Sequence, residues 1–523
     1  MSNFKVIIVG GGPVGLIAGH CFSRAGIDFK ILERREALDL NAGSSVALWP
    51  QSARVLDQLG LLDGAMAAYI PVKYKCNLLP DRRVLSKCDM NAAIQKLHGH
   101  HWMLFHRAKL LEILYDRLPD RENKVQTQKE VTGIFKHETG VTVICADGTK
   151  HQGSIVLGAD GVYSAVRRLM NESVINKDHD QLLPPGLKST YRGIYGHVLL
   201  SPSSHPFPLL TPETLYETHG PHFTFQLIVG PPSCNMLFFF FCARLPSSTP
   251  TKGTTRKRTH YTPHDAHSFV TSLSHHHPTP DYTVQDIWSQ VTWSHMSDLE
   301  EGVIEGDWYD TRDGRIVLAG DAAHKMTPNA GLGLNEGVQD VVGLVNGVCS
   351  MLDDIRARAR KRPMMVQPSS EDLVETFRAY QSLRRPRAAK VVGLSALWTR
   401  MVAWDNWAWR ALDKWVTLAP EMLKVNVDRT GLKWLMSPVV AGGLVLKLKG
   451  MKERGFREGT VKWKEGVPVR RKEIGNWMPR METGREARGW AGWLVQVKGR
   501  GRWILGRRTI EGKKVKGKRG AWV

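Results

Sequence analysis

The sequence predicts an α/β fold in which a Rossmann-type dinucleotide-binding domain is interleaved with a β-sheet domain and is followed by C-terminal helices. Three observations predict it. An apolar strand runs into a glycine-rich turn at the N-terminus, strand patterns dominate the middle of the chain, and glycine-acid segments recur near residues 10, 158 and 320. The order and spacing of these segments suit one chain wrapped around one long dinucleotide.

The N-terminal segment predicts a βαβ unit. Residues 4–9 are almost uniformly apolar, which is typical of a central parallel strand covered on both faces. Residues 13–25 then predict a helix, and residues 28–33 predict a second strand. The glycine-rich turn therefore lies between a strand and a helix.

Helices and strands continue to interleave on both sides of a β-rich middle. The seven-residue run 236–242 (MLFFFFC) is too short to span a membrane and predicts a buried strand. Five tryptophans within 396–415 predict an aromatic helix face that packs against the body of the protein. The other predicted elements are helices at 47–62, with a first regular turn at Pro50, and at 107–118, 265–273, 332–352 and 372–383; a hairpin and returning strand over 142–158; a β-rich stretch from 191 to 241; and a strand over 314–321.

These patterns divide the chain into five regions. We assign residues 1–175 to the first part of the dinucleotide-binding domain, 176–300 to a β-rich substrate domain, and 301–395 to the return of the first domain. Residues 396–446 predict amphipathic and apolar helices, and residues 447–523 form a basic tail of low complexity.

The positive charge of the chain is concentrated in that tail. The formal net charge is +22, and residues 447–523 contain 23 Lys and Arg against 7 Asp and Glu, which leaves +6 for the first 446 residues. A basic surface on the folded part is therefore not expected, and we predict no nucleic-acid partner.

Cysteine and hydropathy patterns exclude several classes of protein. The seven cysteines have no metal-ligand spacing and predict free thiols. Three consecutive histidines within 246–282 are interpreted as part of a solvated loop rather than as a metal site. The N-terminal apolar run is too short for a signal peptide, and no run of about twenty apolar residues predicts a membrane span. The expected location is the cytoplasm or the membrane periphery.

The N-terminal glycines predict a dinucleotide site. In Gly10-x-Gly12-x-x-Gly15, the first glycine permits a tight turn, the second lets the backbone approach a pyrophosphate, and the third lets helix and strand pack closely. Glu33 ends the next predicted strand, where a carboxylate can accept hydrogen bonds from ribose hydroxyls.

Three further segments show a resemblance to a known family. They are 105–110 (FHRAKL), 158–167 (GADGVYSAVR) and 320–335 (GDAAHKMTPNAGLGLN). With the N-terminal glycines, they make residues 4–400 resemble the group A flavoprotein monooxygenases, which have the fold of p-hydroxybenzoate hydroxylase. The resemblance implies FAD as the cofactor and a GR2-like FAD-binding domain.

The same resemblance implies roles for individual residues. Asp321 would hydrogen-bond the ribityl chain, Arg107 would contact the flavin side of FAD, and Asp160 would lie where pyrophosphate and reduced nicotinamide pass. At Leu334 the chain departs from such relatives, which usually have glycine, so extra bulk would lie beneath the flavin. The residues expected at FAD are Gly10, Gly12, Gly15, Glu33, Ala47, Arg107, Asp160, Asp321, Gly331, Gly333 and Leu334.

Within this family, segments 104–107 and 324–329 look most like fungal FAD-dependent epoxidases of indole-diterpene and meroterpenoid biosynthesis. This implies that NAD(P)H reduces FAD and that O2 adds to it as a C4a-hydroperoxide, which epoxidises the prenyl alkene of an apolar substrate before a separate terpene cyclase acts. An aromatic-ring hydroxylase of the salicylate type and a flavin-binding protein without oxygenase activity remain alternatives. The absence of a second GxGxxG argues against the plan with two dinucleotide domains.

Two residues of the β-rich region are candidates for catalysis. Arg192 is expected to polarise the flavin hydroperoxide or bind substrate oxygen, with a surface ion pair as the equal alternative. Tyr216 is a weaker candidate, since a packed strand residue is the commoner role.

The tail carries no predicted chemistry. Its interpretations are an anchor on anionic membrane, supported by the apolar stretch 434–446, a nucleic-acid contact through basic residues and tryptophans, and the translation of a mis-joined exon or unspliced intron. We favour the last, because its commonest residues share guanine-rich codons.

Overall fold

The computed structural model describes residues 4–38, 43–171, 183–201, 206–246, 258–361, 367–422 and 444. All described residues belong to one unit, Met1–Pro468. The basic tail lies outside the described residues, as does the apolar stretch before it except for Leu444.

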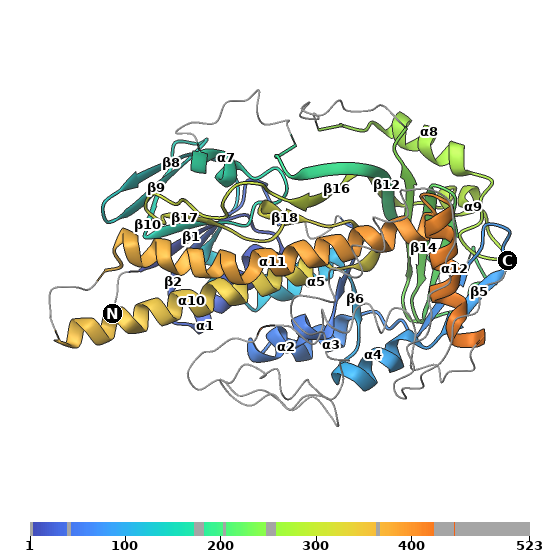
Figure 1. Cartoon of the computed structure of the whole chain (residues 1–523), viewed down its shortest axis with the longest axis horizontal. Coiled ribbons are helices and arrows are strands. Elements are labelled where there is room, and N and C mark those ends of the chain that lie inside the picture. The colour runs from blue at the N-terminus through green and yellow to red at the C-terminus, as the bar shows by residue number, and fades with distance from the viewer. Residues whose placement is uncertain are drawn as a thin grey trace, which may run out of the picture. The chain divides into compact units, whose positions relative to one another are not determined.

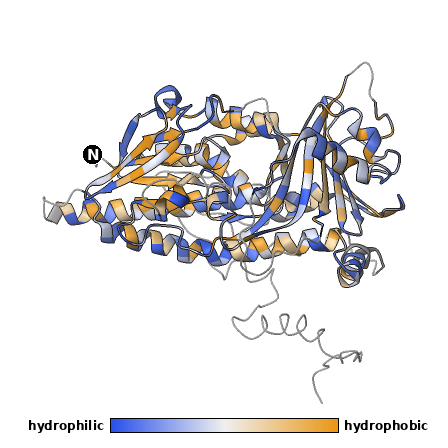
Figure 2. Cartoon of the chain, turned by 90° about the horizontal axis from the view of Figure 1, so that it is seen from above, coloured by the Kyte–Doolittle hydropathy of each residue, from blue (hydrophilic) through white to orange (hydrophobic). Residues whose placement is uncertain are grey.

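A parallel five-stranded sheet forms the core of the dinucleotide-binding domain. Its strand order is β17-β11-β1-β2-β7, and β1, β2, β11 and β17 are largely buried. Helices α1 and α10 pack together beside it, and the strands near the N-terminus are mostly hydrophobic in Figure 2. The elements are β1 (Lys5–Val9), α1 (Pro13–Arg24), β2 (Asp28–Leu32), β7 (Val125–Gln126), β11 (Ile155–Gly158), β17 (Ile316–Leu318) and α10 (Gly333–Lys361). The predicted βαβ unit is confirmed.

Smaller elements surround this sheet. The predicted hairpin before β11 is confirmed as part of a three-stranded antiparallel sheet. The helix predicted over 47–62 starts later, because residues 45–48 pair with β6 as a strand and Pro50 opens the helix. The elements are β3 (Ser45–Leu48), α2 (Pro50–Gln58), α3 (Leu62–Ala68), α4 (Met90–His98), β6 (Met103–His106), α5 (Arg107–Asp116), α6 (Arg121–Lys124), β8 (Val131–His137), β9 (Gly140–Cys145), β10 (Lys150–Gly153) and α7 (Ala165–Asn171).

An eight-stranded sheet, ordered β18-β16-β12-β15-β14-β13-β4-β5, forms the second lobe. It includes β4 and β5, which come from the segment 1–175. The limits of the domains stay predictions. The strands are β4 (Tyr74–Leu78), β5 (Val84–Cys88), β12 (Leu187–Leu199), β13 (Thr214–Gly220), β14 (Phe223–Val229), β15 (Met236–Arg244), β16 (Trp293–Val303) and β18 (His324–Lys325).

The two faces of this sheet have different neighbours. Alternate residues of β13, β14 and β15 pack with α8 (Pro263–Leu273) and α9 (Val284–Trp288) in one apolar cluster. The residues between them face the opposite way, toward the dinucleotide-binding domain and the last helices. The period of two along a strand therefore decides which residues can reach a site between the two sheets.

The C-terminal helices connect the two sheets. In Figure 1, α11 (Ser370–Val402) runs beside α10 and continues past the second sheet to α12 (Trp407–Met422). The prediction of one helix over 396–415 is wrong, since the chain turns at 403–406. Asp405 accepts hydrogen bonds from Tyr191 (3.1 Å) and Arg244 (2.7 Å), and Asn406 caps the backbone N–H groups that open α12.

The turn at 403–406 also divides the predicted aromatic face between α11 and α12. Trp398 and Trp404 are buried, as predicted, but Trp407 and Trp415 are 67% and 70% exposed. No helix of the described ranges combines the length and apolar character needed to cross a membrane.

A buried ion cluster joins α10, α11 and the segment after β17. Asp340 accepts hydrogen bonds from the Gly320 N–H (2.9 Å) and from Arg384 (2.8 Å), and it pairs with His324 (2.6 Å). Arg384 also pairs with Glu336 at 2.6 Å, and both side chains are fully buried. Burial opposes ionisation of Asp340, but His324 and Arg384 outweigh it and hold the pKa of Asp340 at about 2.

A second buried cluster fastens α12 to the sheet. His219 of β13 pairs with Asp413 of α12 at 2.8 Å and lies 3.5 Å from Glu217. Burial opposes the charge on His219, but the two carboxylates outweigh it and raise its pKa to about 9. His219 is therefore an imidazolium at neutral pH, and Asp413 also accepts a hydrogen bond from Trp404 (2.8 Å).

We expect Arg384→Leu to lower the free energy of unfolding by about 3–5 kcal/mol, because it removes the fully buried cation that Glu336 and Asp340 share. Urea denaturation at pH 7 measures the change. The control Arg378→Leu replaces an exposed arginine of the same helix and should change stability by less than about 0.5 kcal/mol. Equal effects of the two substitutions would contradict the role of the cluster.

The His219 cluster predicts a specific pH dependence. Since the pKa of His219 is about 9 in the folded protein and about 6.5 in an unfolded chain, its stabilisation is complete below pH 6.5 and is lost as the pH rises through about 9. His219→Gln should flatten the decline in unfolding free energy across this interval, and His260→Gln, at an exposed position, should not. An unchanged pH slope in His219→Gln would refute the assignment.

Candidate active site

The glycine-rich turn between β1 and α1 leaves an open cradle. Gly10 has a positive φ of 108°, and a Cβ there would lie 2.5 Å from the carbonyl oxygen of Ala159. A Cβ on Gly15 would lie 1.9 Å from the carbonyl oxygen of Gly10. A Cβ on Gly12 would meet nothing within 4 Å. The first and third glycines are therefore required by packing, whereas Gly12 borders free space at the helix N-terminus, which suits a pyrophosphate.

Glu33 lies beside this cradle, directly after β2. One of its oxygens accepts a hydrogen bond from the Gly11 N–H at 2.7 Å, and the other accepts one from the Arg35 N–H at 3.0 Å. These bonds hold the carboxylate at the carboxyl edge of the parallel sheet. The position fits the predicted ribose contact, which stays a prediction.

Asp160 follows β11 at the same edge of the sheet. Its Oδ2 accepts a hydrogen bond from the Val166 N–H at 3.1 Å and so caps α7. Its buried Oδ1 has no hydrogen-bond partner among the described residues, and burial raises the pKa of the carboxyl. The orphaned oxygen fits a site that a polar ligand completes.

The third glycine-acid segment reaches the same place from β17. Gly320 lies against α1, where a Cβ would be 3.3 Å from the side chain of Val14. Asp321 forms an ion pair with Lys325 and lies near Gly333. The fold thus brings together the segments near residues 10, 158 and 320, as the sequence predicts.

The segment from Pro328 to α10 passes beneath this region. Gly331 has a φ of 62°, and a Cβ there would lie 3.1 Å from the Cβ of Ala47. Sequence reasoning missed Asn335, which is fully buried. Its amide group accepts a hydrogen bond from the Trp49 N–H (2.8 Å) and donates to the carbonyls of Ala47 (2.9 Å) and Gly331 (2.8 Å). Asn335 therefore fixes β3 against the glycine turn.

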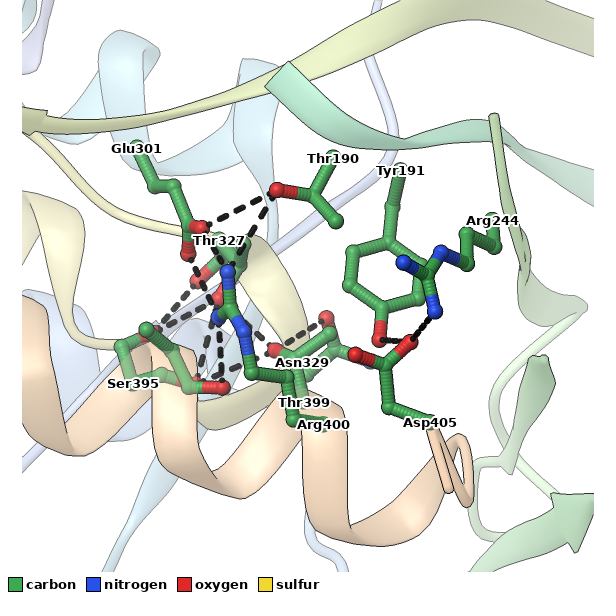
Figure 3. A network of polar contacts seen from close by, with 11 residues as sticks. Thr190, Tyr191, Arg244, Glu301, Thr327, Asn329, Ser395, Thr399, Arg400 and Asp405 are labelled. Atoms are coloured by element: carbon green, nitrogen blue, oxygen red, sulfur yellow. Dashed lines mark hydrogen bonds and ion pairs between the residues drawn. The ribbon is translucent and has the colours of Figure 1, made fainter. Parts of the chain in front are cut away.

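A row of hydroxyl groups attaches this segment to α11 (Figure 3). Ser395 donates to the carbonyl of Thr327 (3.0 Å), and the Thr327 and Thr399 hydroxyls lie 2.8 Å apart. Thr399 donates to Oδ1 of Asn329 at 3.1 Å. Beside this row, Arg400 pairs with Glu301 of β16. The row and the ion pair anchor one end of α11 to both lobes.

A cavity of about 240 Å³ lies between the segment 321–334 and the eight-stranded sheet. The predicted residues Ala47, Asp321, Gly331, Gly333 and Leu334 all line it. The rest of its lining is mainly apolar, with a few polar side chains: Ser45, Val46, Trp49, Lys75, Met90, Trp102, Leu104, Leu215, Gln226, Ile228, Lys325, Met326, Pro328, Asn329, Ala330, Leu332 and Trp398.

Arg107 opens α5 beside this region, and its N–H donates to the carbonyl of Ser44 at 2.9 Å. Its side chain packs against Gly43, where a Cβ would lie 3.1 Å from the Cβ of Arg107. Arg107 is not part of the cavity lining, and its contact with FAD stays a prediction.

The two predicted catalytic residues lie on the face of the sheet that packs against α8 and α9. The Arg192 guanidinium lies 5.0 Å from the ring centre of Phe269 on α8. Tyr216 is buried in the cluster with α8 and α9, and its oxygen accepts a hydrogen bond from the Thr211 N–H at 3.0 Å. Neither residue lines the cavity, because strand alternation sends the neighbour Leu215 there instead of Tyr216. The catalytic roles of Arg192 and Tyr216 stay predictions.

Comparison with known proteins agrees with this geometry. The family model described as FAD binding domain matches residues 3–183 and 281–360. The FAD-dependent monooxygenase srdH of Neurospora crassa is 31% identical over 477 residues, which cover 89% of this chain and all of srdH. The FAD-dependent monooxygenase DEP2 of Fusarium langsethiae is 30% identical over 422 residues, which cover 79% of this chain and 75% of DEP2.

Solved structures share the fold. Klebsiella pneumoniae HpxO, complexed with FAD and uric acid, aligns with a TM-score of 0.61 at 19% identity over 84% of this chain and 97% of HpxO. Native FqzB aligns with a TM-score of 0.61 at 18% identity over 84% of this chain and 94% of FqzB. The sequence relatives and the shared fold together show that the chain belongs to the FAD-dependent monooxygenases with the p-hydroxybenzoate hydroxylase fold.

Proposed function

We propose that this monooxygenase uses NAD(P)H and O2 to epoxidise a prenyl alkene of an apolar terpenoid substrate. The observation that carries the proposal is the cavity beside the predicted flavin residues, whose walls include Trp49, Trp102 and Trp398. Aromatic and aliphatic walls favour an apolar chain over a small, highly polar ring. Resemblance to fungal epoxidases supports the choice of an alkene.

The residues at the sheet edge fit FAD. Gly12 would leave room for the pyrophosphate, Glu33 would bind ribose hydroxyls, and Asp321 would bind the ribityl chain. Gly331 and Gly333 would let the backbone lie close under the flavin ring. When bound, FAD supplies the two-electron redox chemistry with which reduced nicotinamide and O2 react.

The protein's own contribution is to position the substrate and exclude water. The hydroxyl row and Asn335 hydrogen-bond residues 327–335 to α11 and β3, which favours a cavity wall that is already formed when a substrate arrives. The apolar walls exclude water from the reacting atoms, which suppresses side reactions with water.

The proposed reaction also suggests a pathway partner and a location for the enzyme. A separate terpene cyclase would consume the epoxide. Two exposed tryptophans of α12, Trp407 and Trp415, support peripheral membrane association through the C-terminal region, where an apolar substrate would be concentrated.

Substitution of Gly12 tests the FAD site directly. Gly12→Ala should lower the affinity for FAD at least tenfold without changing the thermal stability of the apoprotein, because the added methyl group enters free space that the pyrophosphate needs. Titration with FAD measures the affinity. The control Gly306→Ala also adds a methyl group in open space, away from the site, and should leave affinity unchanged. Unchanged FAD affinity in Gly12→Ala would reject this site.

Mass spectrometry of turnover products tests the reaction. With FAD, NADPH and air, we expect a gain of about 16 Da, one oxygen atom, on a geranylgeranylated indole and no product from salicylate. Oxygenation of salicylate alone would favour the aromatic hydroxylase. NADPH-independent flavin binding with no oxygen uptake on any substrate would indicate a flavin-binding protein without oxygenase activity.

A further inference from the structure

Lys75, Gln226 and Asn329 form one polar group in the cavity lining, which we call its polar end; Ser45 and the Asp321–Lys325 ion pair supply the other polar side chains there. Lys75 of β4 and Asn329 both line it, and both are more than nine-tenths buried. Burying a cation and an amide beside apolar walls is costly unless both are bound. The hydrogen bonds around them show which donors are already used.

Lys75 has one carboxylate partner and spare hydrogens. Its ammonium lies 2.5 Å from Glu217 and 4.6 Å above the centre of the Trp398 ring. An ammonium has three hydrogens, and the ion pair uses only part of them. Glu217 in turn is held by His219 (3.5 Å) and by the amide of Gln226 (2.6 Å), so the cluster fixes the position of the ammonium.

Gln226 has no donor left for a ligand. Its Nε2 donates to Glu217 at 2.6 Å and to the carbonyl of Asn329 at 2.9 Å, which uses both of its hydrogens. Gln226 is therefore a positioning residue that ties the ion pair to the segment under the cavity.

Asn329 has an unused donor. In the row of Figure 3, Ser395 donates to the Thr327 carbonyl, the Thr327 and Thr399 hydroxyls share a hydrogen bond, and Thr399 donates to Oδ1 of Asn329 at 3.1 Å. This arrangement orients the amide and leaves Nδ2 buried without a hydrogen-bond partner among the described residues. Such a buried donor is costly until a ligand accepts a hydrogen bond from it.

We infer that Lys75 and Asn329 bind one acceptor oxygen of the substrate, so that the enzyme selects an apolar molecule carrying a carbonyl-type oxygen. The oxygen at the polar end would fix which part of the apolar chain reaches the flavin side, near Gly331 and Leu334. This deepens the proposed function and rests on it for the identity of the reaction, but the binding preference itself requires no turnover.

Binding of a matched pair of probes tests the inference. Geranylacetone is a prenyl ketone, and 2,6-dimethylundeca-2,6-diene is the same skeleton without the oxygen. Equilibrium dialysis with the FAD-loaded full chain should show at least tenfold tighter binding of the ketone. Equal affinities for the two probes would overturn the inference.

Two variants locate the preference. Lys75→Met/Glu217→Gln removes both charges of the ion pair, so no lone carboxylate is left buried, and it should reduce the preference to threefold or less with hydrocarbon binding within twofold. Asn329→Asp keeps the acceptor for Thr399 but replaces the free donor, and it should weaken ketone binding alone. Retention of the full preference in both variants would overturn the assignment of these residues.

Matched controls separate these effects from general ones. Lys109→Met removes an exposed lysine that pairs with Glu112, and Asn406→Asp alters an exposed helix cap. Both should keep the tenfold preference, and loss of preference in the controls would count against the site. A protein that prefers the ketone but yields no oxygenated product would refute the proposed function and leave this inference standing.

Discussion

The buried carboxylate of Asp340 fixes the part of the chain on which the site depends. It accepts a hydrogen bond from the Gly320 N–H and forms ion pairs with His324 and Arg384. It therefore joins the end of β17 to α10 and α11. Burial makes these bonds strong and makes the loss of any partner costly. With this cluster in place, Asp321 and the segment that follows reach the edge of the parallel sheet where the glycine-rich turn and Glu33 lie.

Helix α11 extends that constraint to the second lobe. Its serine and threonine hydroxyls hold residues 327–329, and the turn after it binds β12 and β15 through Asp405. One helix therefore positions both walls of the cavity, the segment 321–334 and the eight-stranded sheet. A cavity assembled from such distant segments can be rigid without any local strain, because each segment is hydrogen-bonded to the same support.

Local patterns predicted much of this fold. The βαβ unit, the glycine cradle and the buried run of β15 depend on residues close in sequence, and they were predictable from periodicity and glycine spacing. The polar end of the cavity was not, because Lys75, Glu217 and Asn329 meet only in the folded chain. The positions of Arg192 and Tyr216 relative to the cavity were not predictable either, because a sequence shows that a strand exists but not which face its odd and even residues cover. The break at 403–406 depends on bonds from Asp405 to distant strands, which outweigh local helix propensity.

A crystal structure of the full chain with FAD bound tests the proposed architecture most directly. We expect the pyrophosphate at Gly12, the ribose at Glu33, and the flavin ring against the backbone of 331–333 and Ala47, with Lys75 and Asn329 on the open side of the cavity. The backbone of 320–334 should keep the conformation described here. A flavin ring seated elsewhere, or a rearranged 320–334 segment, would contradict the assignment of the site.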